Sequence, residues 1–81
     1  MAHETTHILY EWEPTTEVEI MGQVRRYSQG PRSLIVHRLD TLSHFPMIPE
    51  NAQATPVYYS GYVEKWFLAN GRELSPERIC G

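Results

Sequence analysis

The stretch Val57–Leu74, VYYSGYVEKWFLANGREL, decides the fold, because no other part of the chain carries so many large apolar side chains. It contains three of the five tyrosines, one of the two tryptophans and one of the two phenylalanines. Aromatic side chains dominate the energetics of a core, so the remaining segments are expected to pack around this stretch. Its Asn70-Gly71 pair favours a type I′ turn. We predict a strand that ends at Ala69, a hairpin turn, and a short return strand over Arg72–Leu74.

The same residues also fit an amphipathic helix, and this alternative stays open on sequence grounds. Large apolar side chains recur with helical spacing at Tyr59, Tyr62, Val63, Trp66 and Phe67. Ser60 would cap such a helix and Gly71 would follow its end. However, Gly61 would fall in the first turn, and Tyr, Val, Trp and Phe all favour strands. The strand is favoured, and the alternative is an α+β fold with a helix at 58–70 on a three-stranded antiparallel sheet.

Upstream, alternating polar and apolar residues predict three more strands. In Thr6–Glu13 the apolar residues lie on one face, with Leu9 as the only mismatch. Glu17–Tyr27 alternates in the same way, and Gly22 within it indicates a bulge or a bend. Ser33–Leu39 has consecutive apolar residues, which predict burial on both faces. Short connections favour pairing of these three strands as an antiparallel meander.

The remaining segments complete an expected all-β fold. Asp40–Pro56 has three prolines and no sustained period, so we predict a long ordered loop. Ser75–Arg78 resembles one helical turn, with serine as cap and proline at the first position. The prediction is a small antiparallel sheet, or a partly open SH3-like or OB-like barrel, of about five strands. Residues 1–5 are expected to form a flexible N-terminal segment, and residues 6–81 a single globular domain.

Length, charge and cysteine content narrow the class of protein. A chain of 81 residues with a net charge of −3 suits one soluble domain and disfavours binding to phosphate backbones. No apolar run is long enough to span a bilayer, so no membrane partner is expected. The single cysteine, Cys80, cannot form an internal disulfide, which indicates a reducing compartment. We therefore expect a cytoplasmic protein, and a free-standing domain this small fits a phage or mobile-element origin.

The motifs for catalysis are weak. His3-Glu4-Thr5-Thr6-His7 matches the zinc-peptidase pattern H-E-x-x-H, whose chemistry requires both histidines one helical turn apart. Here the motif runs into a predicted strand, so we interpret the match as a coincidence. His37 and His44 are interpreted as ordinary polar residues, and Cys80 as an inert thiol because nothing builds a pocket around it. We expect no metal, no cofactor and no enzymatic activity.

Charges and aromatic residues instead indicate a binding protein. If the first two strands paired, four acids would meet at one hairpin tip and would attract a basic surface on another protein: Glu11, Glu13, Glu17 and Glu19. Arg25, Arg26 and Arg32 would gather at the opposite end of the second strand. On a continuous strand Tyr58, Tyr62 and Trp66 share one face, and exposed Tyr and Trp are enriched at binding hot spots.

Two functional hypotheses follow from these patterns. The first is a non-catalytic protein–protein interaction module, such as a regulator, an inhibitor or an accessory subunit, that binds through Tyr58, Tyr62, Trp66 and the acidic tip. Homodimerisation is a variant of this hypothesis. The alternative is a small barrel that binds single-stranded nucleic acid, with Arg25, Arg26, Arg32 and Arg38 on phosphates and tyrosines stacking on bases.

Overall fold

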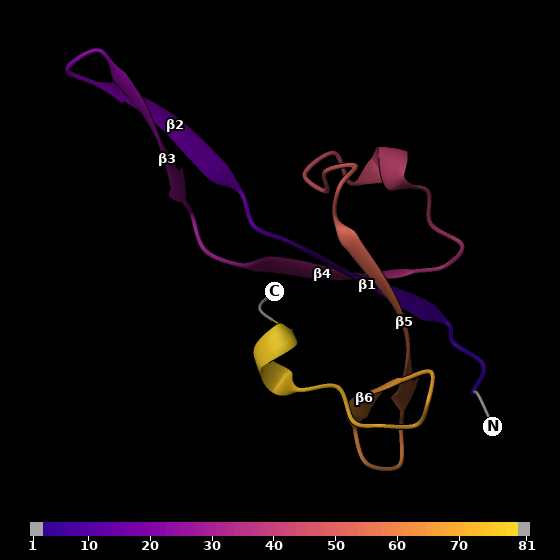
Figure 1. Ribbon diagram of the computed structural model, residues 1–81. Helices are drawn as coiled ribbons and strands as arrows, with labels where there is room; N and C mark the ends of the chain where they lie inside the picture. Colours follow the sequence, from indigo (N-terminus) through magenta and orange to yellow (C-terminus); the bar gives the residue numbers. More distant parts are fainter. Residues whose placement is uncertain (1–2, 80–81) are drawn as a thin grey trace.

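The computed structural model describes residues 3–79, and these residues form an open, all-β structure (Figure 1). Its elements are β1 (His7–Trp12), β2 (Thr15–Ile20), β3 (Gln23–Ser28), β4 (Arg32–His37), the 3₁₀ turn η1 (Leu42–His44), β5 (Gln53–Ser60), β6 (Lys65–Leu68) and the 3₁₀ turn η2 (Pro76–Arg78). Four strands form an antiparallel sheet in the order β4-β1-β5-β6, and β2 pairs with β3 in a separate sheet. The predicted antiparallel sheet is confirmed, whereas neither sheet closes into a barrel within the described residues.

The aromatic stretch forms two strands joined by a loop, so the helix at 58–70 is wrong. β5 and β6 pair antiparallel, with Tyr58 opposite Phe67 and Tyr59 opposite Trp66. The chain reverses through residues 61–64, where the amide of Glu64 donates to the carbonyl of Ser60 at 2.8 Å. Glu64 adopts a positive φ of 56° there. The expectation of one continuous strand up to Ala69 is therefore also wrong.

The second reversal lies at Asn70-Gly71, as predicted, but it is not a type I′ turn. Among the turn residues only Gly71 has a positive φ, of 85°. The amide of Gly71 donates to the carbonyl of Leu68 at 2.9 Å, and the amide of Leu68 donates to that of Arg72 at 2.8 Å. This is a three-residue connection with a glycine bulge, which also suits Asn-Gly sequences. The return segment pairs through a single bridge between Phe67 and Glu73.

The segment Glu17–Tyr27 is two strands instead of the one predicted. Met21 and Gly22 have positive φ values of 53° and 78°, as both central residues of a type I′ turn require. β2 and β3 therefore fold back on each other, with Ile20 opposite Gln23 next to the turn. The predicted meander is wrong as well, because both edges of β1 are already occupied by β4 and β5.

The core lies on one face of the four-stranded sheet. Leu9, Val57 and Leu74 are at most 2% exposed and form this core, so Leu9 is its centre and not a mismatch. Packed against them are the half-buried side chains of Ile35, Trp66, Leu68 and Ile79. The burial of β4 on both faces is largely confirmed, because Ser33 and Val36 are both buried and the residues between them are half-buried.

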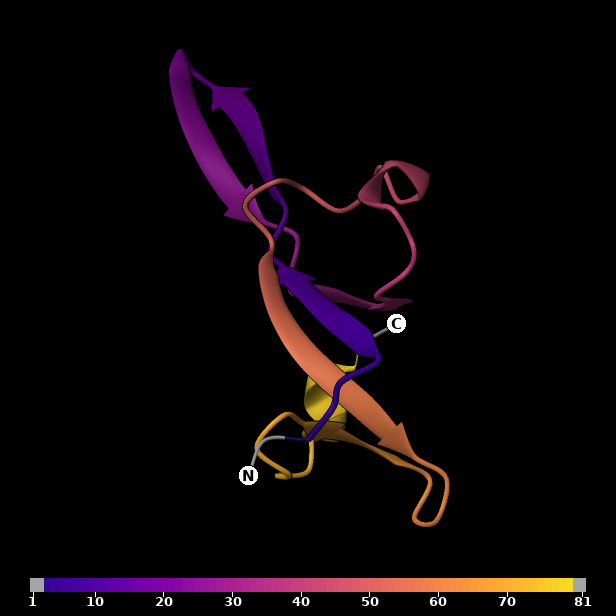
Figure 2. The ribbon, with the colours of Figure 1, turned by 90° about the vertical axis from the view of Figure 1, so that its right-hand side faces the viewer.

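The C-terminal turn η2 and the long loop lie on opposite faces of β1. Arg78 of η2 forms an ion pair with Glu11, with 2.6 Å between nitrogen and oxygen. The neighbouring residue Trp12 lines a groove with Met47 and Pro49 of the loop. Because successive strand residues point to opposite faces, the two contacts place these segments on either side of the sheet. Figure 2 shows the loop with η1 standing away from the strands on one side.

The first described residues are hydrogen-bonded to the sheet. The amide of His3 donates to the carbonyl of Ala69 at 2.8 Å, and the amide of Thr6 donates to that of Val57 at 3.1 Å. The guanidinium of Arg38 donates to the carbonyl of Thr5 at 3.0 Å. Cys80, predicted to be inert, lies outside the described residues.

Candidate protein-binding site

The β2–β3 hairpin projects from the rest of the molecule as a separate arm (Figure 1). We call Thr15–Ser28 the hairpin arm and the four-stranded sheet with its covering segments the body. A hydrogen bond of 2.8 Å from the amide of Gln29 to the carbonyl of Pro14 closes the base of the arm. In both strands every residue is exposed except Thr16, which is half-buried. The arm gives the molecule principal extents of 55 × 25 × 20 Å.

One face of the hairpin arm carries three large apolar side chains among three polar ones. Directly opposite residues of an antiparallel pair share a face, so Val18 lies beside Arg25 and Ile20 beside Gln23. Tyr27 continues this face toward the base, opposite Thr16. Val18, Ile20 and Tyr27 are 39%, 45% and 47% exposed. We call the surface of these three side chains the apolar face; the side chain of Met21 extends beyond it at the tip and is 99% exposed.

The other face is polar and carries a cross-strand ion pair. Arg26 and Glu17 lie opposite each other, with 2.9 Å between Nη2 and Oε1. Both side chains are more than half exposed, so this pair contributes at most about 1 kcal/mol. Glu19 and Val24 form the next pair toward the tip. Two acids and two bases leave the arm with no net charge.

The predicted acidic tip does not form. Glu11 lies in the body, where Arg78 donates two hydrogen bonds to it at 3.1 and 2.6 Å and the pKa of Arg78 is raised by this contact. Glu13 accepts a hydrogen bond of 2.6 Å from the hydroxyl of Ser28 at the base of the arm. Only Glu17 and Glu19 lie on the arm itself. The four acids are dispersed because β1 and β2 do not pair.

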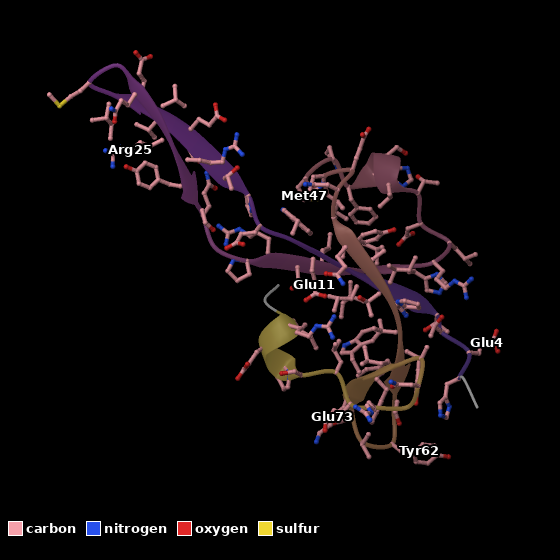
Figure 3. All side chains as sticks on the ribbon, in the orientation of Figure 1. Glu4, Glu11, Arg25, Met47, Tyr62 and Glu73 are labelled. Carbon is pink, nitrogen blue, oxygen red and sulfur yellow. The ribbon has the colours of Figure 1, made fainter. Side chains whose placement is uncertain are left out.

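The predicted aromatic patch is also divided. Tyr58 stacks on Phe67 with 5.6 Å between ring centroids, whereas Trp66 contacts Tyr59 at 5.2 Å on the opposite face of the sheet. Tyr62 lies in the loop between these strands and is fully exposed. Figure 3 shows Tyr62 at the end of the body remote from Arg25, which lies near the tip of the arm. The three residues therefore share no common surface, because the chain reverses between them.

The four arginines of the nucleic-acid alternative do not form a basic surface. Arg25 and Arg26 lie on β3, and Arg26 is neutralised by its ion pair. Arg32 begins β4, while Arg38 follows the other end of that strand. The predicted gathering of Arg25, Arg26 and Arg32 is wrong, since the link from β3 to β4 carries Arg32 into the body.

Three of the four histidines make ring contacts, at two separate places in the body. His3 packs on Tyr58 with 5.1 Å between centroids, whereas His7 contacts His37 at 4.8 Å and Trp66 at 4.9 Å. Within residues 3–79, no three His, Cys, Asp or Glu side chains are arranged to hold a metal ion. The H-E-x-x-H segment is extended and not helical, so it lacks the geometry that the motif requires.

Stability is expected to fall as the pH decreases below about 6.5, because of His7. Desolvation and the neighbouring His37 lower the pKa of His7 in the folded chain, and Asp40 opposes this only in part. The unfolded chain therefore binds the proton more readily than the folded chain does. His7 contributes fully to the free energy of unfolding above about pH 6.5, and this contribution is lost as the pH falls through the lowered pKa. Urea unfolding at a series of pH values measures this loss.

The matched control for that titration is His44, which is exposed in η1. His7→Gln should flatten the decrease in unfolding free energy on acidification, and His44→Gln should leave it unchanged. An equal effect of both substitutions would assign the acid sensitivity to a different group.

Two open grooves meet at the base of the hairpin arm, and Trp12 and Glu13 line both. The larger, of about 520 Å³, lies between the start of the arm and the loop segment from Met47 to Asn51. The smaller, of about 350 Å³, adjoins the Glu11–Arg78 ion pair and the beginning of β4. Among the residues that line them, no serine or cysteine lies beside a histidine, so neither groove has the pairing that activates a nucleophile.

No protein family model matches this sequence, and no characterised protein or solved structure shows significant similarity to it. Neither 3₁₀ turn, nor any other helical segment of residues 3–79, has the length and apolarity needed to cross a bilayer.

Sequence reasoning missed the apolar face of the hairpin arm. A single strand over Glu17–Tyr27, as the sequence predicts, has no such face, because it forms only when the segment folds back into β2 and β3. The signal that could have found it is Met21-Gly22, since glycine is the residue best suited to the second central position of a type I′ turn.

Proposed function

We propose that this chain is a non-catalytic protein–protein interaction module and that the hairpin arm is its binding element. The observation that supports this proposal is the apolar face of the arm, with Met21 beside it at the tip, which no other segment of the described chain covers. Exposed apolar patches on soluble domains commonly mark sites of protein interaction.

The instability of isolated hairpins gives a second physical reason. A two-stranded ribbon is marginally stable in water, because it cannot remove its apolar side chains from solvent. A partner that covers the apolar face would supply the missing burial, at about 25 cal/mol for each square ångström of apolar surface. The arm would then be ordered most firmly in the complex.

The chemistry of the arm favours protein over nucleic acid as the partner. An arm without net charge, on a chain with a net charge of −3, provides little attraction for phosphates. Of the residues predicted from the sequence for partner binding, Glu17 and Glu19 lie on the arm and stay in the proposal as groups that orient the partner. A regulator, an inhibitor or an accessory subunit in the cytoplasm would each use such a module.

Removal of the hairpin arm tests the proposal. The backbones of Pro14 and Gln29 already face each other, so an Asn-Gly turn can replace Thr15–Ser28 without disturbing the body. We expect the intact chain to bind a protein from a lysate of its native host, and the armless chain to lose that binding while its circular dichroism still shows a folded sheet. Tyr62→Ala, which alters an exposed aromatic residue of the body, should retain binding. Capture of the same protein by the armless chain would contradict the proposal.

A further inference from the structure

The hairpin arm has two open strand edges. Among the described strands β2 and β3 pair only with each other, so the outer edge of each is unpaired. In a hairpin with a two-residue turn the pair next to the turn is hydrogen-bonded, and bonded and non-bonded pairs then alternate. The bond from the amide of Gln29 to the carbonyl of Pro14 fits this alternation. The backbone groups of Thr15, Glu17 and Glu19 therefore point away from β3, toward the open edge.

Along the β2 edge, apolar and acidic side chains are on separate faces. Val18 and Ile20 lie on the apolar face, whereas Glu17 and Glu19 lie on the polar face. Glu17 is paired with Arg26, but Glu19 forms no ion pair within residues 3–79. A strand added beside β2 would therefore meet apolar side chains on one face and carboxylates on the other.

The β3 edge lacks this separation. On the apolar face Arg25 lies between Gln23 and Tyr27, and on the polar face Val24 lies beside Arg26. Each face of β3 thus mixes charged and apolar side chains, and no strand with a simple alternation complements it. For the same reason β3 of a second copy does not match the β2 edge, because its two arginines point to opposite faces.

The open groove of about 520 Å³ continues the β2 edge into the body. The residues that line it include Thr15 of β2 and Met47, Pro49 and Asn51 of the long loop, but none from β3. Figures 1 and 2 both show β2 on the side of the arm that faces this loop. Trp12 and Met47 give the groove apolar walls, and the side chain of Met47 is 59% exposed. An extended segment that follows β2 toward the base of the arm would end in this groove.

We infer that the hairpin arm binds an extended segment of a partner protein, with alternating basic and apolar residues, as a third strand along β2. This inference rests on the proposed function, because it names the chemistry of the partner at the same arm. The basic side chains lie beside Glu17 and Glu19, and the apolar ones lie beside Val18 and Ile20 and extend the apolar face. Strand addition to an open edge is a common mode of peptide recognition, and three strands are more stable than an isolated ribbon of two.

Hydrogen exchange measured by NMR tests the inference with two synthetic peptides of about ten residues. In one, lysine and valine alternate; in the control, the lysines precede the valines, so the two residue types do not separate onto two faces. At saturation, the alternating peptide should slow exchange of the amides of Glu17 and Glu19 by about tenfold or more. The amides of Val24 and Arg26, on the open β3 edge, should exchange as before. Protection of the β3 amides alone, or equal protection by the two peptides, would overturn the third strand.

Methylation of the peptide backbone distinguishes strand addition from simple attraction between charges. Methyl groups on alternate amides block one edge of an extended peptide and leave the other edge free. Methylated lysine amides would block an antiparallel third strand, and methylated valine amides would block a parallel one. We expect one of these two peptides to bind about tenfold more weakly than the other. Equal affinities would show that no backbone ladder forms with β2.

Substitutions in the protein test where the segment lies. Glu19→Gln removes the carboxylate without an ion pair and should raise the dissociation constant of the alternating peptide by about 2- to 5-fold. Met47→Lys places a cation in the groove at the base of the arm and should weaken binding to a similar degree. Glu64→Gln is the matched control, since it removes the same charge from an exposed position of the body and should leave binding unchanged. If neither Glu19→Gln nor Met47→Lys weakens binding, the segment does not lie along β2.

The remaining outcomes separate this inference from the proposed function. If the alternating peptide does not protect β2, but removal of the arm still abolishes capture of the native partner, only the third strand is overturned. If the armless chain binds the alternating peptide as well as the intact chain does, the binding is only the attraction of an acidic chain for a basic peptide, and the third strand is again overturned. If the armless chain also retains the native partner, the proposed function is overturned as well.

Discussion

Replacing Leu9 with alanine is expected to lower the free energy of unfolding by about 3 kcal/mol, a large part of the stability of so small a domain. Leu9 is 0% exposed and lies in the core cluster with Val57 and Leu74. Its loss removes buried apolar surface and leaves a cavity between strands that cannot collapse on it fully. Thermal unfolding followed by circular dichroism should show a midpoint about 12–24 °C lower.

Leu39→Ala is the matched control for this substitution. Leu39 follows β4 and is 85% exposed, so the same chemical change there should alter the free energy of unfolding by less than about 0.5 kcal/mol. If Leu9→Ala and Leu39→Ala unfold at the same temperature, the core does not lie on the face of β1 that contains Leu9.

The burial of Leu9 shows where reasoning from local sequence ends. The alternation of Thr6–Glu13 correctly predicts a strand, and the two faces of that strand are as expected. What the alternation cannot show is that segments distant in the chain cover the face that contains Leu9. One cover comes from η2, about seventy residues later in the chain, through the ion pair between Arg78 and Glu11. Such a contact between distant segments leaves no periodicity in either of them.

One of the two glycine turns can be predicted from its own residues, and the other cannot. Asn70-Gly71 reverses the chain as predicted, because glycine adopts a positive φ readily. Met21-Gly22 was missed, since methionine is a poor residue for the positive φ of 53° that it adopts. The strand pairing of β2 with β3 supports that turn, and local sequence does not reveal this pairing.

The candidate site was predicted only in part for the same reason. Glu17, Glu19, Arg25 and Arg26 were identified as charges that matter for binding, and all four lie on the hairpin arm. Their grouping with Glu11 and Glu13 depended on a hairpin between β1 and β2 that does not form. Because the turn was predicted between β1 and β2 and not within Glu17–Tyr27, the sequence predicts an acidic tip that does not form and does not predict the apolar face of the arm.

Trp66→Ala is expected to destabilise the fold by about 3 kcal/mol, in contrast to its predicted role in an exposed aromatic patch. Trp66 is half-buried, packs against the core cluster, and contacts the rings of His7 and Tyr59 at 4.9 and 5.2 Å. Its truncation opens the core between β1 and β6, because the Trp66 ring fills the space next to His7 of β1. Urea unfolding monitored by circular dichroism should show a lower midpoint with an unchanged slope.

Tyr62→Ala provides the comparison, since its side chain is fully exposed and the same kind of aromatic truncation removes no buried contact. Its free energy of unfolding should stay within about 0.5 kcal/mol of the wild type. The two variants, both drawn from the patch predicted on one continuous strand, then differ in stability because the chain reverses at residues 61–64 and places only Trp66 on the core. Equal stability of the two variants would mean that this reversal does not exist in solution, and that the strand runs through as the sequence alone suggests.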